Sequence, residues 1–446
     1  MRFHPHTQAE IAAMLAVVGA PTLDDLIAHV PARLRERAAI GLPSGLDEQA
    51  VAARLAALAA KNRPGADGAS FLGAGYYRHY VPAAVRAIIA RAELATAYTP
   101  YQAEASQGTT QAIFEFQSLI AQLTGLEVAN ASMYDGASAT AEAVLMARRM
   151  MPRRSRVAIS RALWPDYRQT VRTYLSAQDG LEIIETPLDP VVGATDLDAL
   201  RALADERLLC VVTGYPNYFG IIEPLAEVSA IAHQAGAISI STSAEALALG
   251  LLKSPGELGV DIAVGEGQSF GMPLEYGGPG VGFMATRMAH VRQMPGRLVG
   301  QSHDDRGNRA FTLTLATREQ HIRRERATSN ICTNNSLCAL AATVYLAMMG
   351  RRGLRDLAGL NVERAHRAAA MLEAAGLPRR FSGPFFNEFA IATDDPAALL
   401  GRAEHHDVLA GVAVGRQDSD RSGAILIAVT EMNADDDLRR LVDAVK

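Results

Sequence analysis

The residues best suited to chemistry lie close together in one short segment of the chain. Tyr98, Tyr101, Gln102 and Glu104 fall within seven positions, around Pro100. Tyrosine hydroxyls can donate hydrogen bonds to a phosphate or a carboxylate, and a glutamate can orient an amine. The segment therefore predicts a rigid polar surface that contacts a small charged molecule. The alternative is a hydrogen-bonded loop with half-buried tyrosines.

A second candidate site is the sequence Gly-Ala-Ser at 136–138, directly before a helix predicted over 139–150. Free backbone N–H groups at the start of a helix favour an anion such as phosphate, so Gly136 and Ser138 are candidate ligands. Serine is also a common helix cap, and Ser138 as a simple cap is the alternative.

The glycine-rich sequence Gly-Gly-Pro-Gly at 277–280 allows close approach of the backbone to another group. It predicts either an ordinary tight turn or a loop packed against an active-site region.

Composition excludes several classes of function. The formal net charge of −5 gives no basic surface for nucleic acid or an anionic membrane. No apolar run approaches the roughly 20 residues that span a bilayer, and no signal-peptide core follows the first residues. Cys210, Cys332 and Cys338 lack metal-ligand spacing, and one would be left over from any disulfide. These features predict a cytoplasmic protein without a metal.

The elements around these residues alternate between helix and strand. Between residues 71 and 300, helices are predicted at 109–123, 139–150 and 225–235, and short Val- and Ile-rich strands at 156–159, 208–213, 237–241 and 262–264. This alternation indicates an α/β fold with a mostly parallel sheet. We expect a helical arm over residues 1–65, a large domain over 66–300, and a linking helix with a small α+β domain over 301–446. In the arm, the residues from Thr7 to Glu10 predict a capping box, a second short helix is expected to end at Pro31, and a loop is expected at 62–65. In the last part, helices are predicted at 336–349 and 364–375.

Seven phrases occur in a fixed order along the chain: HPHT at 4–7, FLGAGYY at 71–77, YTPYQAEASQGT at 98–109, YPNYFG at 215–220, GEGQSFGMPLEYGGPG at 265–280, RATSNICTN at 326–334 and AVTEMN at 428–433. Together they resemble the alpha subunits of the two-subunit P-proteins of the glycine cleavage system. The resemblance covers nearly the whole chain. It implies the fold type I architecture of PLP-dependent transferases, with a seven-stranded sheet and a small C-terminal domain.

The same resemblance implies that the chain lacks a complete cofactor site. Where the lysine-bearing half has His-Lys-Thr-Phe, this chain has Gly-Gln-Ser-Phe, so Gln268 replaces the lysine that would bind PLP. No aspartate follows the strand at 237–241 to face the pyridine nitrogen, and the nearest acid, Glu245, is expected to begin a helix. PLP is therefore expected on the beta subunit, and the isolated chain is expected to be inactive.

Residues of this chain are expected to complete the partner's active site. In fold type I dimers, the region matching 98–104 crosses to the partner, which implies such a role for Tyr98, Tyr101, Gln102 and Glu104. The resemblance extends this expectation to Tyr76 and His79. The anion site at Gly136 and Ser138 would be vestigial.

The expected function is decarboxylation of glycine by the alpha–beta pair, with transfer of the aminomethyl group to the lipoyl arm of H-protein. The assembly is expected to be αβ or (αβ)2. One alternative is a structural or regulatory pseudoenzyme. Another is a self-sufficient PLP enzyme that uses Lys253, one of only three lysines in the chain; Lys253 lies in an apparent exposed turn.

Overall fold

The computed structural model describes residues 5–38, 41–62, 68–331, 333–416 and 423–446. The chain forms two compact units, Met1–Pro64 and Gly65–Lys446. Cys332 and most of the loop predicted at 62–65 lie outside the described residues.

The first unit is helical, as predicted, with α1 (Gln8–Val18), α2 (Leu23–Leu26), α3 (Ala32–Arg37) and α4 (Glu48–Ala59). The predicted capping box at Thr7 is confirmed, because its hydroxyl accepts the N–H of Glu10 while the Glu10 carboxylate accepts the N–H of Thr7. Thr22 begins α2 in the same way. The sequence reading missed α3, because Pro31 suggested an end to the helical pattern, whereas it directly precedes a further helix.

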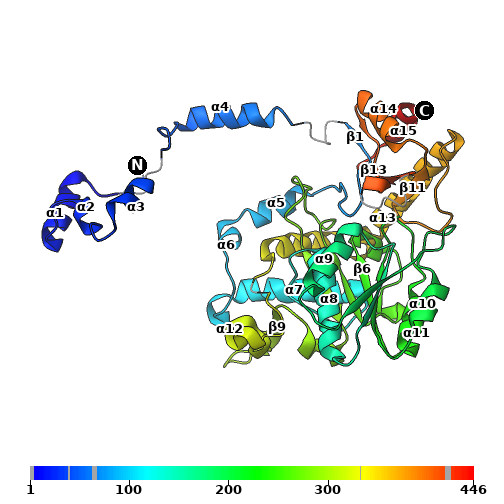
Figure 1. Ribbon diagram of the computed structural model, residues 1–446, viewed down its shortest axis with the longest axis horizontal. Helices are drawn as coiled ribbons and strands as arrows, with labels where there is room; N and C mark the ends of the chain where they lie inside the picture. Colours follow the sequence, from blue (N-terminus) through cyan, green and yellow to red (C-terminus); the bar gives the residue numbers. More distant parts are fainter. Residues whose placement is uncertain (1–4, 39–40, 63–67, 332, 417–422) are drawn as a thin grey trace. The chain divides into compact units, whose positions relative to one another are not determined.

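The second unit is built on a seven-stranded sheet in the order β2-β8-β7-β6-β5-β3-β4 (Figure 1). Its strands are β2 (Val128–Ala129), β3 (Arg156–Ser160), β4 (Glu182–Thr186), β5 (Leu208–Gly214), β6 (Ile238–Ser243), β7 (Ile262–Glu266) and β8 (Gly282–Thr286). Strands β3 to β7 pair in parallel, and β8 and β2 pair antiparallel. The predicted α/β fold with a mostly parallel sheet is confirmed.

Helices cover both faces of this sheet: α8 (Gly136–Met150), α9 (Pro165–Leu175), α10 (Leu197–Leu203) and α11 (Leu225–Gln234). Successive residues of β6 point to opposite faces. Thr242 meets Thr140 of α8 at 3.2 Å, whereas Ser239 meets Ser229 of α11 at 2.9 Å. The helices α8 and α11 thus lie on opposite faces, which explains why the central strands are buried throughout.

Shorter elements surround the sheet. They are β1 (Ala69–Ser70), α5 (Ala83–Ile89), α6 (Ala92–Ala95), η1 (Ala103–Ala105), α7 (Gln107–Thr124), η2 (Ala246–Gly250), η3 (Gly256–Leu258), η4 (Met288–Gln293), β9 (Leu298–His303), β10 (Arg309–Thr314), η5 (Ala316–Arg318), α12 (Gln320–Arg323) and η6 (Arg324–Arg326). Strands β9 and β10 form an antiparallel hairpin beside α7.

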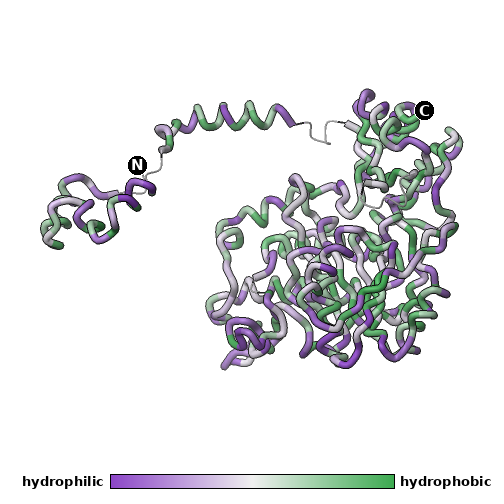
Figure 2. Tube along the Cα trace, in the orientation of Figure 1, coloured by the Kyte–Doolittle hydropathy of each residue, from purple (hydrophilic) through white to green (hydrophobic). Residues whose placement is uncertain are grey.

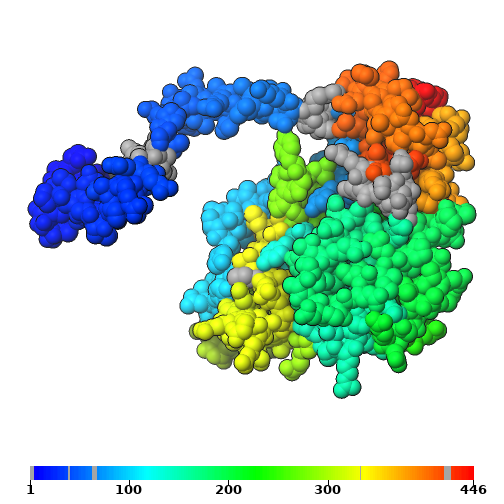
Figure 3. Space-filling model, in the orientation of Figure 1, coloured from blue at the N-terminus to red at the C-terminus, as the bar shows by residue number. Residues whose placement is uncertain are grey.

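The C-terminal part follows α13 (Ser336–Ala374), whose backbone is non-helical at Gly350, with φ 59° and ψ 178°. The helices predicted at 336–349 and 364–375 are the two ends of α13, and the second begins earlier than predicted. A three-stranded sheet, β11-β14-β13, follows with α14 and α15, and Figure 3 shows this part in orange to red. The bounds are β11 (Glu388–Ala392), α14 (Pro396–His405), β12 (Val408–Leu409), β13 (Val412–Ala413), η7 (Val414–Arg416), β14 (Ala424–Ala428) and α15 (Asp435–Val445). The predicted domain boundary after residue 300 stays a prediction.

Buried apolar residues form the core of the second unit, in which Figure 2 shows several green, hydrophobic stretches. The largest group of buried apolar residues joins α8, α9 and the sheet to the C-terminal strands. This continuous core holds the ends of β6 and β7 in fixed positions. Across the described residues, no helix is both long and apolar enough to cross a membrane.

Candidate functional site

The N-terminus of α8 lies at the end of β7, where the sequence suggested an anion site. Asp135 caps this helix, because its Oδ1 accepts the N–H of Ser138 at 2.7 Å, and the Ser138 hydroxyl accepts the N–H of Asp135. The alternative of Ser138 as the cap is therefore wrong. Serine and aspartate are both common N-cap residues, so residue type alone does not identify the cap. The cap is the residue at which the backbone becomes helical, which is Asp135.

The carboxyl group of Glu266 lies against the first N–H of α8. Glu266 ends β7 and is 0% exposed. Its Oε2 accepts the N–H of Gly136 at 3.0 Å, and its Oε1 accepts those of Val281 at 2.7 Å and Gln268 at 3.1 Å. Burial raises the pKa of Glu266 to about 7, against the opposing effect of these N–H groups. The Glu266 carboxyl group therefore binds the Gly136 N–H group that the sequence predicted as a ligand for phosphate.

Two glycines make this close packing possible. A Cβ at Gly280 would lie 2.8 Å from a carboxylate oxygen of Glu266, and a Cβ at Gly136 would lie 2.4 Å from the Tyr167 hydroxyl. The Asn335 amide also donates to the Gly280 carbonyl at 2.7 Å. Each of the two readings holds for part of the 277–280 sequence. Gly280 packs against the candidate site, whereas the exposed Gly277 closes a turn by donating its N–H to the Leu274 carbonyl at 2.8 Å.

Gln268, in the position of the expected lysine, is buried and bonded at both ends of its amide. It is 2% exposed. Its Oε1 accepts the N–H of Tyr77 at 3.1 Å, and its Nε2 donates to the carbonyl of Met272 at 2.8 Å. The amide thus joins the 71–80 segment to the loop after β7.

We expect Gln268→Lys to destabilise the chain by about 2–4 kcal/mol, because it buries an ammonium group and removes the acceptor for the Tyr77 N–H. Urea unfolding of the isolated chain measures this change. Gln268→Met, which has a similar length and no charge, should cost less. A lysine variant as stable as wild type would show that the site has room for an amine.

His79 forms a buried charge cluster between the end of β6 and the C-terminal part. Its Nε2 lies 2.9 Å from Glu245 Oε2, and its Nδ1 lies 2.9 Å from Glu431 Oε2. Burial alone would lower the pKa of His79, but the two carboxylates raise it to about 10. In turn, His79 lowers the pKa of Glu431 to about 2, although burial acts in the opposite direction. His79 is therefore an imidazolium at neutral pH, with both nitrogens engaged within its own chain.

Glu245 has two roles in this cluster. The predicted helix start is confirmed, because its Oε1 accepts the N–H of Leu247 at the beginning of η2. Its Oε2 meets His79 and also accepts an N–H from Asn387 at 3.2 Å. The acid nearest the end of β6 is thus already paired.

Glu388, the first residue of β11, also binds the 71–80 segment. It accepts the N–H of Ala74 at 2.6 Å and the hydroxyl of Tyr77 at 2.8 Å. Burial raises the pKa of Glu388 to about 7, and the Glu245 charge adds to the shift. The 71–80 segment is therefore fixed to β6, β7 and β11 together.

Stability should fall as the pH rises from about 5 to 10. The folded pKa values of Glu266 and Glu388, about 7, lie above the ordinary 4.5, so their contribution is full below 4.5 and is lost as pH rises through 7. The His79 contribution is full below 6.5 and is lost through about 10. The loss should total on the order of a few kcal/mol. Urea midpoints at pH 5.5, 7 and 9 measure it, and midpoints that rise with pH would contradict the prediction.

The structure brings together only some of the predicted site residues. Tyr76 is half-buried near the α8 N-terminus, where burial and the charges of Glu266 and Asp135 raise its pKa. Tyr76 and His79 thus lie in the segment that fills the candidate site. His79 is positioned to hold that segment rather than to touch a bound molecule.

The Tyr98–Glu104 residues form a different, exposed surface. Tyr98 is 73% exposed and Tyr101 is 50% exposed, and Gln102 and Glu104 are also exposed. The Tyr101 hydroxyl accepts an N–H from Arg297 at 3.3 Å, and its ring meets His321 edge-on at 5.4 Å. Tyr101 is therefore oriented, while the other three side chains face solvent.

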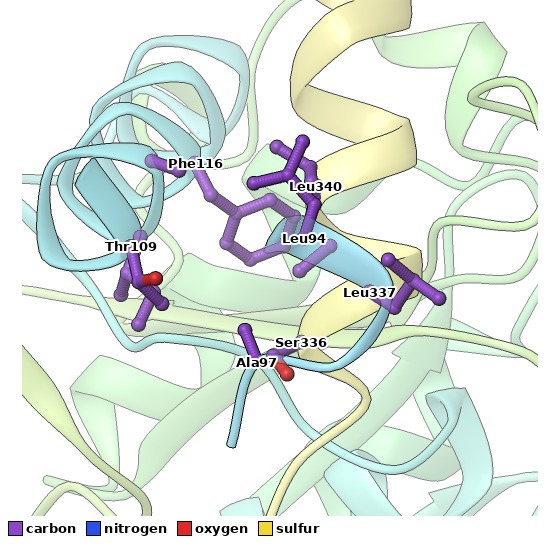
Figure 4. A pocket seen from close by; sticks show the side chains of 10 residues that line it. Leu94, Ala97, Thr109, Phe116, Ser336, Leu337 and Leu340 are labelled. Atoms are coloured by element: carbon purple, nitrogen blue, oxygen red, sulfur yellow. The ribbon is translucent and has the colours of Figure 1, made fainter. Parts of the chain in front are cut away.

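An apolar pocket adjoins this segment in the sequence, because Leu94 and Ala97 are among its lining residues (Figure 4). Helices α7 and α13 supply the remaining side chains, including Phe116 and Leu340. The ten described lining residues carry no charge, so this pocket is not suited to a phosphate. Across the described residues, no group of histidine, cysteine and acidic side chains could hold a metal ion.

The residues of this chain do not fit PLP. The lysine position is an amide that is bonded at both ends. The acid nearest the end of β6 is paired with His79, and the α8 N-terminus holds the Glu266 carboxyl. Each of the three attachments that the cofactor needs is thus occupied by a side chain of the protein itself.

Sequence reasoning missed Glu266, Glu388 and Glu431 as members of this site. Glu266 and Glu431 lie in phrases that carry the family resemblance, but neither phrase shows what the acid contacts. Glu266 could have been found, because it follows a run of apolar residues that predicts a buried strand. A buried acid needs hydrogen-bond donors around it, so its position marks a polar site. The contacts of Glu388 and Glu431 span more than 300 positions and leave no local pattern.

The chain is similar to proteins of one family over its whole length. The family model "Glycine cleavage system P-protein" matches residues 1–445. The chain is 49% identical to a probable glycine dehydrogenase (decarboxylating) subunit 1 of Anaeromyxobacter dehalogenans, and 48% identical to that of Moorella thermoacetica. These alignments cover 100% of this chain and 100% and 99% of the relatives.

Solved structures give the same result. The crystal structure of a glycine decarboxylase (P-protein) of the glycine cleavage system, in inhibitor-bound form, is 44% identical, with a TM-score of 0.92, over 100% of this chain and 99% of that chain. A NifS-like protein, at 15% identity and TM-score 0.63, covers 85% of this chain and 98% of its own and shows the fold alone. The chain therefore belongs to the glycine cleavage system P-protein family and has the fold type I architecture of PLP-dependent transferases.

Proposed function

We propose that this chain is the alpha half of a two-subunit P-protein, and that a lysine-bearing beta half binds PLP. The pair would decarboxylate glycine and transfer the aminomethyl group to the lipoyl arm of H-protein. The observation that carries the proposal is the filled site, because Gln268 replaces the lysine and is bonded within the chain. The relatives named subunit 1 support the existence of a second subunit.

The contribution of this chain to catalysis would come from the exposed 98–104 surface. Glu104 and Tyr98 face solvent, so a partner's site could receive them without disturbing the core. Arg297 fixes the Tyr101 hydroxyl in advance, which lowers the entropic cost of orienting it. Tyr76 and His79 would act indirectly, by holding the 71–80 segment in place.

A partner subunit would also cover apolar surface on the N-terminal unit. The described helices α1 to α4 bury none of their residues, and Val17 and Leu42 are 89% and 78% exposed. An obligate interface of this kind covers about 2,000 Å2 or more. The proposal includes an αβ or (αβ)2 assembly. We expect it in the cytoplasm, from the cysteine pattern.

The experiment is glycine–CO2 exchange with lipoylated H-protein, run on the alpha chain, the beta chain and the co-expressed pair. We expect exchange from the pair, none from the alpha chain, and one complex on size exclusion. A co-expressed alpha chain that elutes as a monomer, or that exchanges CO2 alone, would contradict the proposal.

A structural or regulatory subunit is the second candidate. In both candidates Gln268, His79 and Glu266 have their polar groups bonded within the chain, so these residues do not separate the two. Substitutions in the exposed 98–104 surface separate the two candidates, since only a catalytic contribution requires those side chains.

A further inference from the structure

The Glu266 carboxyl has an unusual set of neighbours for a side chain that no mechanism on this chain uses. Three backbone N–H groups, at 2.7, 3.0 and 3.1 Å, converge on its two oxygens. One of them is the first N–H of a 15-residue helix, where the helix dipole favours negative charge. Convergent amides at a helix N-terminus are also how proteins bind phosphate groups.

Helix capping does not explain this arrangement. Asp135 already caps α8 through the N–H of Ser138 at 2.7 Å. Glu266 comes from a different strand, 130 residues away, and bonds the Gly136 N–H, which the cap leaves free. Two acidic side chains thus meet at one helix start, although burial and, to a lesser extent, the Asp135 charge raise the pKa of Glu266. The second carboxylate is the feature that requires an explanation.

We propose that Glu266 is an internal anion that takes the place of a phosphate group, and thereby excludes phosphorylated ligands of the PLP class from this chain. The inference rests on the proposed function, in which only the partner binds PLP. A phosphate entering here would meet an ionised carboxylate and find these three N–H donors already in use.

The surrounding residues pack closely around the Glu266 carboxyl group. Gly280 and Gly136 lie so close to Glu266 and Tyr167 that even a methyl group at either glycine would meet an oxygen within 2.8 Å. Removing the Glu266 side chain should therefore expose three unpaired N–H groups in a buried space. Those donors should bind a small anion, since unpaired buried amides are costly.

The test compares wild type with Glu266→Ala as the isolated full-length chain at pH 8, in sodium phosphate and in sodium chloride of equal ionic strength. Glu266→Ala should have a lower Tm than wild type in chloride, and phosphate should raise that Tm by about 2–5 °C by mass action. Wild type should show the same Tm in both salts. Calorimetric titration with pyridoxine 5′-phosphate, which has no aldehyde to react with lysines, should give at least 10-fold tighter binding by the variant.

Glu223→Ala is the matched control. Glu223 is 3% exposed and also has a pKa raised to about 7 by burial. Among the described residues, one backbone N–H, that of Thr195, donates to it, together with an Asn217 amide. Phosphate should not stabilise that variant more than chloride does.

Two results would overturn the proposal: a folded Glu266→Ala variant that phosphate stabilises no better than chloride, or a wild type that gains as much. If Glu266→Ala does not fold in chloride, it and Glu266→Ser are refolded from urea in each salt. Recovery in phosphate alone supports the proposal, and failure of both variants in both salts overturns it. None of these measurements involves the partner, so they can succeed even if the proposed function fails.

Discussion

Replacing Glu104 by glutamine, or Tyr101 by phenylalanine, should lower glycine–CO2 exchange by the alpha–beta pair about 10- to 1000-fold, the range for losing a proton-transfer or charge-positioning group. Both side chains are exposed in the isolated chain, so their loss should leave its folding intact. Complex formation on size exclusion should also survive. The measurement is kcat and KM for exchange with the reconstituted pair.

Two control variants make the same chemical changes at exposed residues outside the 98–104 surface. Glu115→Gln removes an exposed carboxylate on α7, and Tyr276→Phe removes the hydroxyl of a tyrosine that is 90% exposed. Both control variants should keep wild-type exchange. Full activity in Glu104→Gln and Tyr101→Phe would instead favour a purely structural role for this chain.

His79→Ala should destabilise the isolated chain by about 3–5 kcal/mol, the cost of leaving buried charges without their partner. Glu245 and Glu431 both lie within 2.9 Å of the imidazole, and the Glu245 and His79 side chains are 3% and 1% exposed. Urea unfolding at pH 7 measures the loss.

His233→Ala is the matched control, since His233 also meets a carboxylate at 2.9 Å, that of Asp261, but its side chain is 42% exposed. Exposed ion pairs contribute about 1 kcal/mol or less, so this variant should remain close to wild type. Equal losses for the two histidine variants would show that burial of the His79 cluster has no special effect on stability.

Much of the fold could be predicted because its signals are local. The strands β3, β5, β6 and β7 are short Val- and Ile-rich runs, and the capping box at Thr7 shows in four consecutive residues. The strand β4 was missed, because its sequence, EIIET, contains two glutamates among five residues and is largely half-buried. The first helix predicted in α13 ends at residue 349, beside the non-helical Gly350, whereas the second was predicted to begin only at residue 364, well after that break.

The site was less predictable, because its contacts join distant parts of the chain. The sequence identified the residue in the lysine position, Gln268, but not the Tyr77 N–H that binds it from 191 positions away. It placed an anion site at Gly136 without foreseeing that Glu266 would fill it. His79 was expected to reach a partner, yet its nearest charges, Glu245 and Glu431, come from its own chain.

The central claim is that this chain forms half of a PLP enzyme and that the other half binds the cofactor. Borohydride reduction of the active pair, followed by mass spectrometry of its peptides, tests this directly, because reduction fixes PLP to the lysine that holds it. This chain offers only Lys61, Lys253 and Lys446. We expect the label on a single lysine of the beta subunit and none on this chain. Stoichiometric label on Lys253, or on either of the other two, would contradict it.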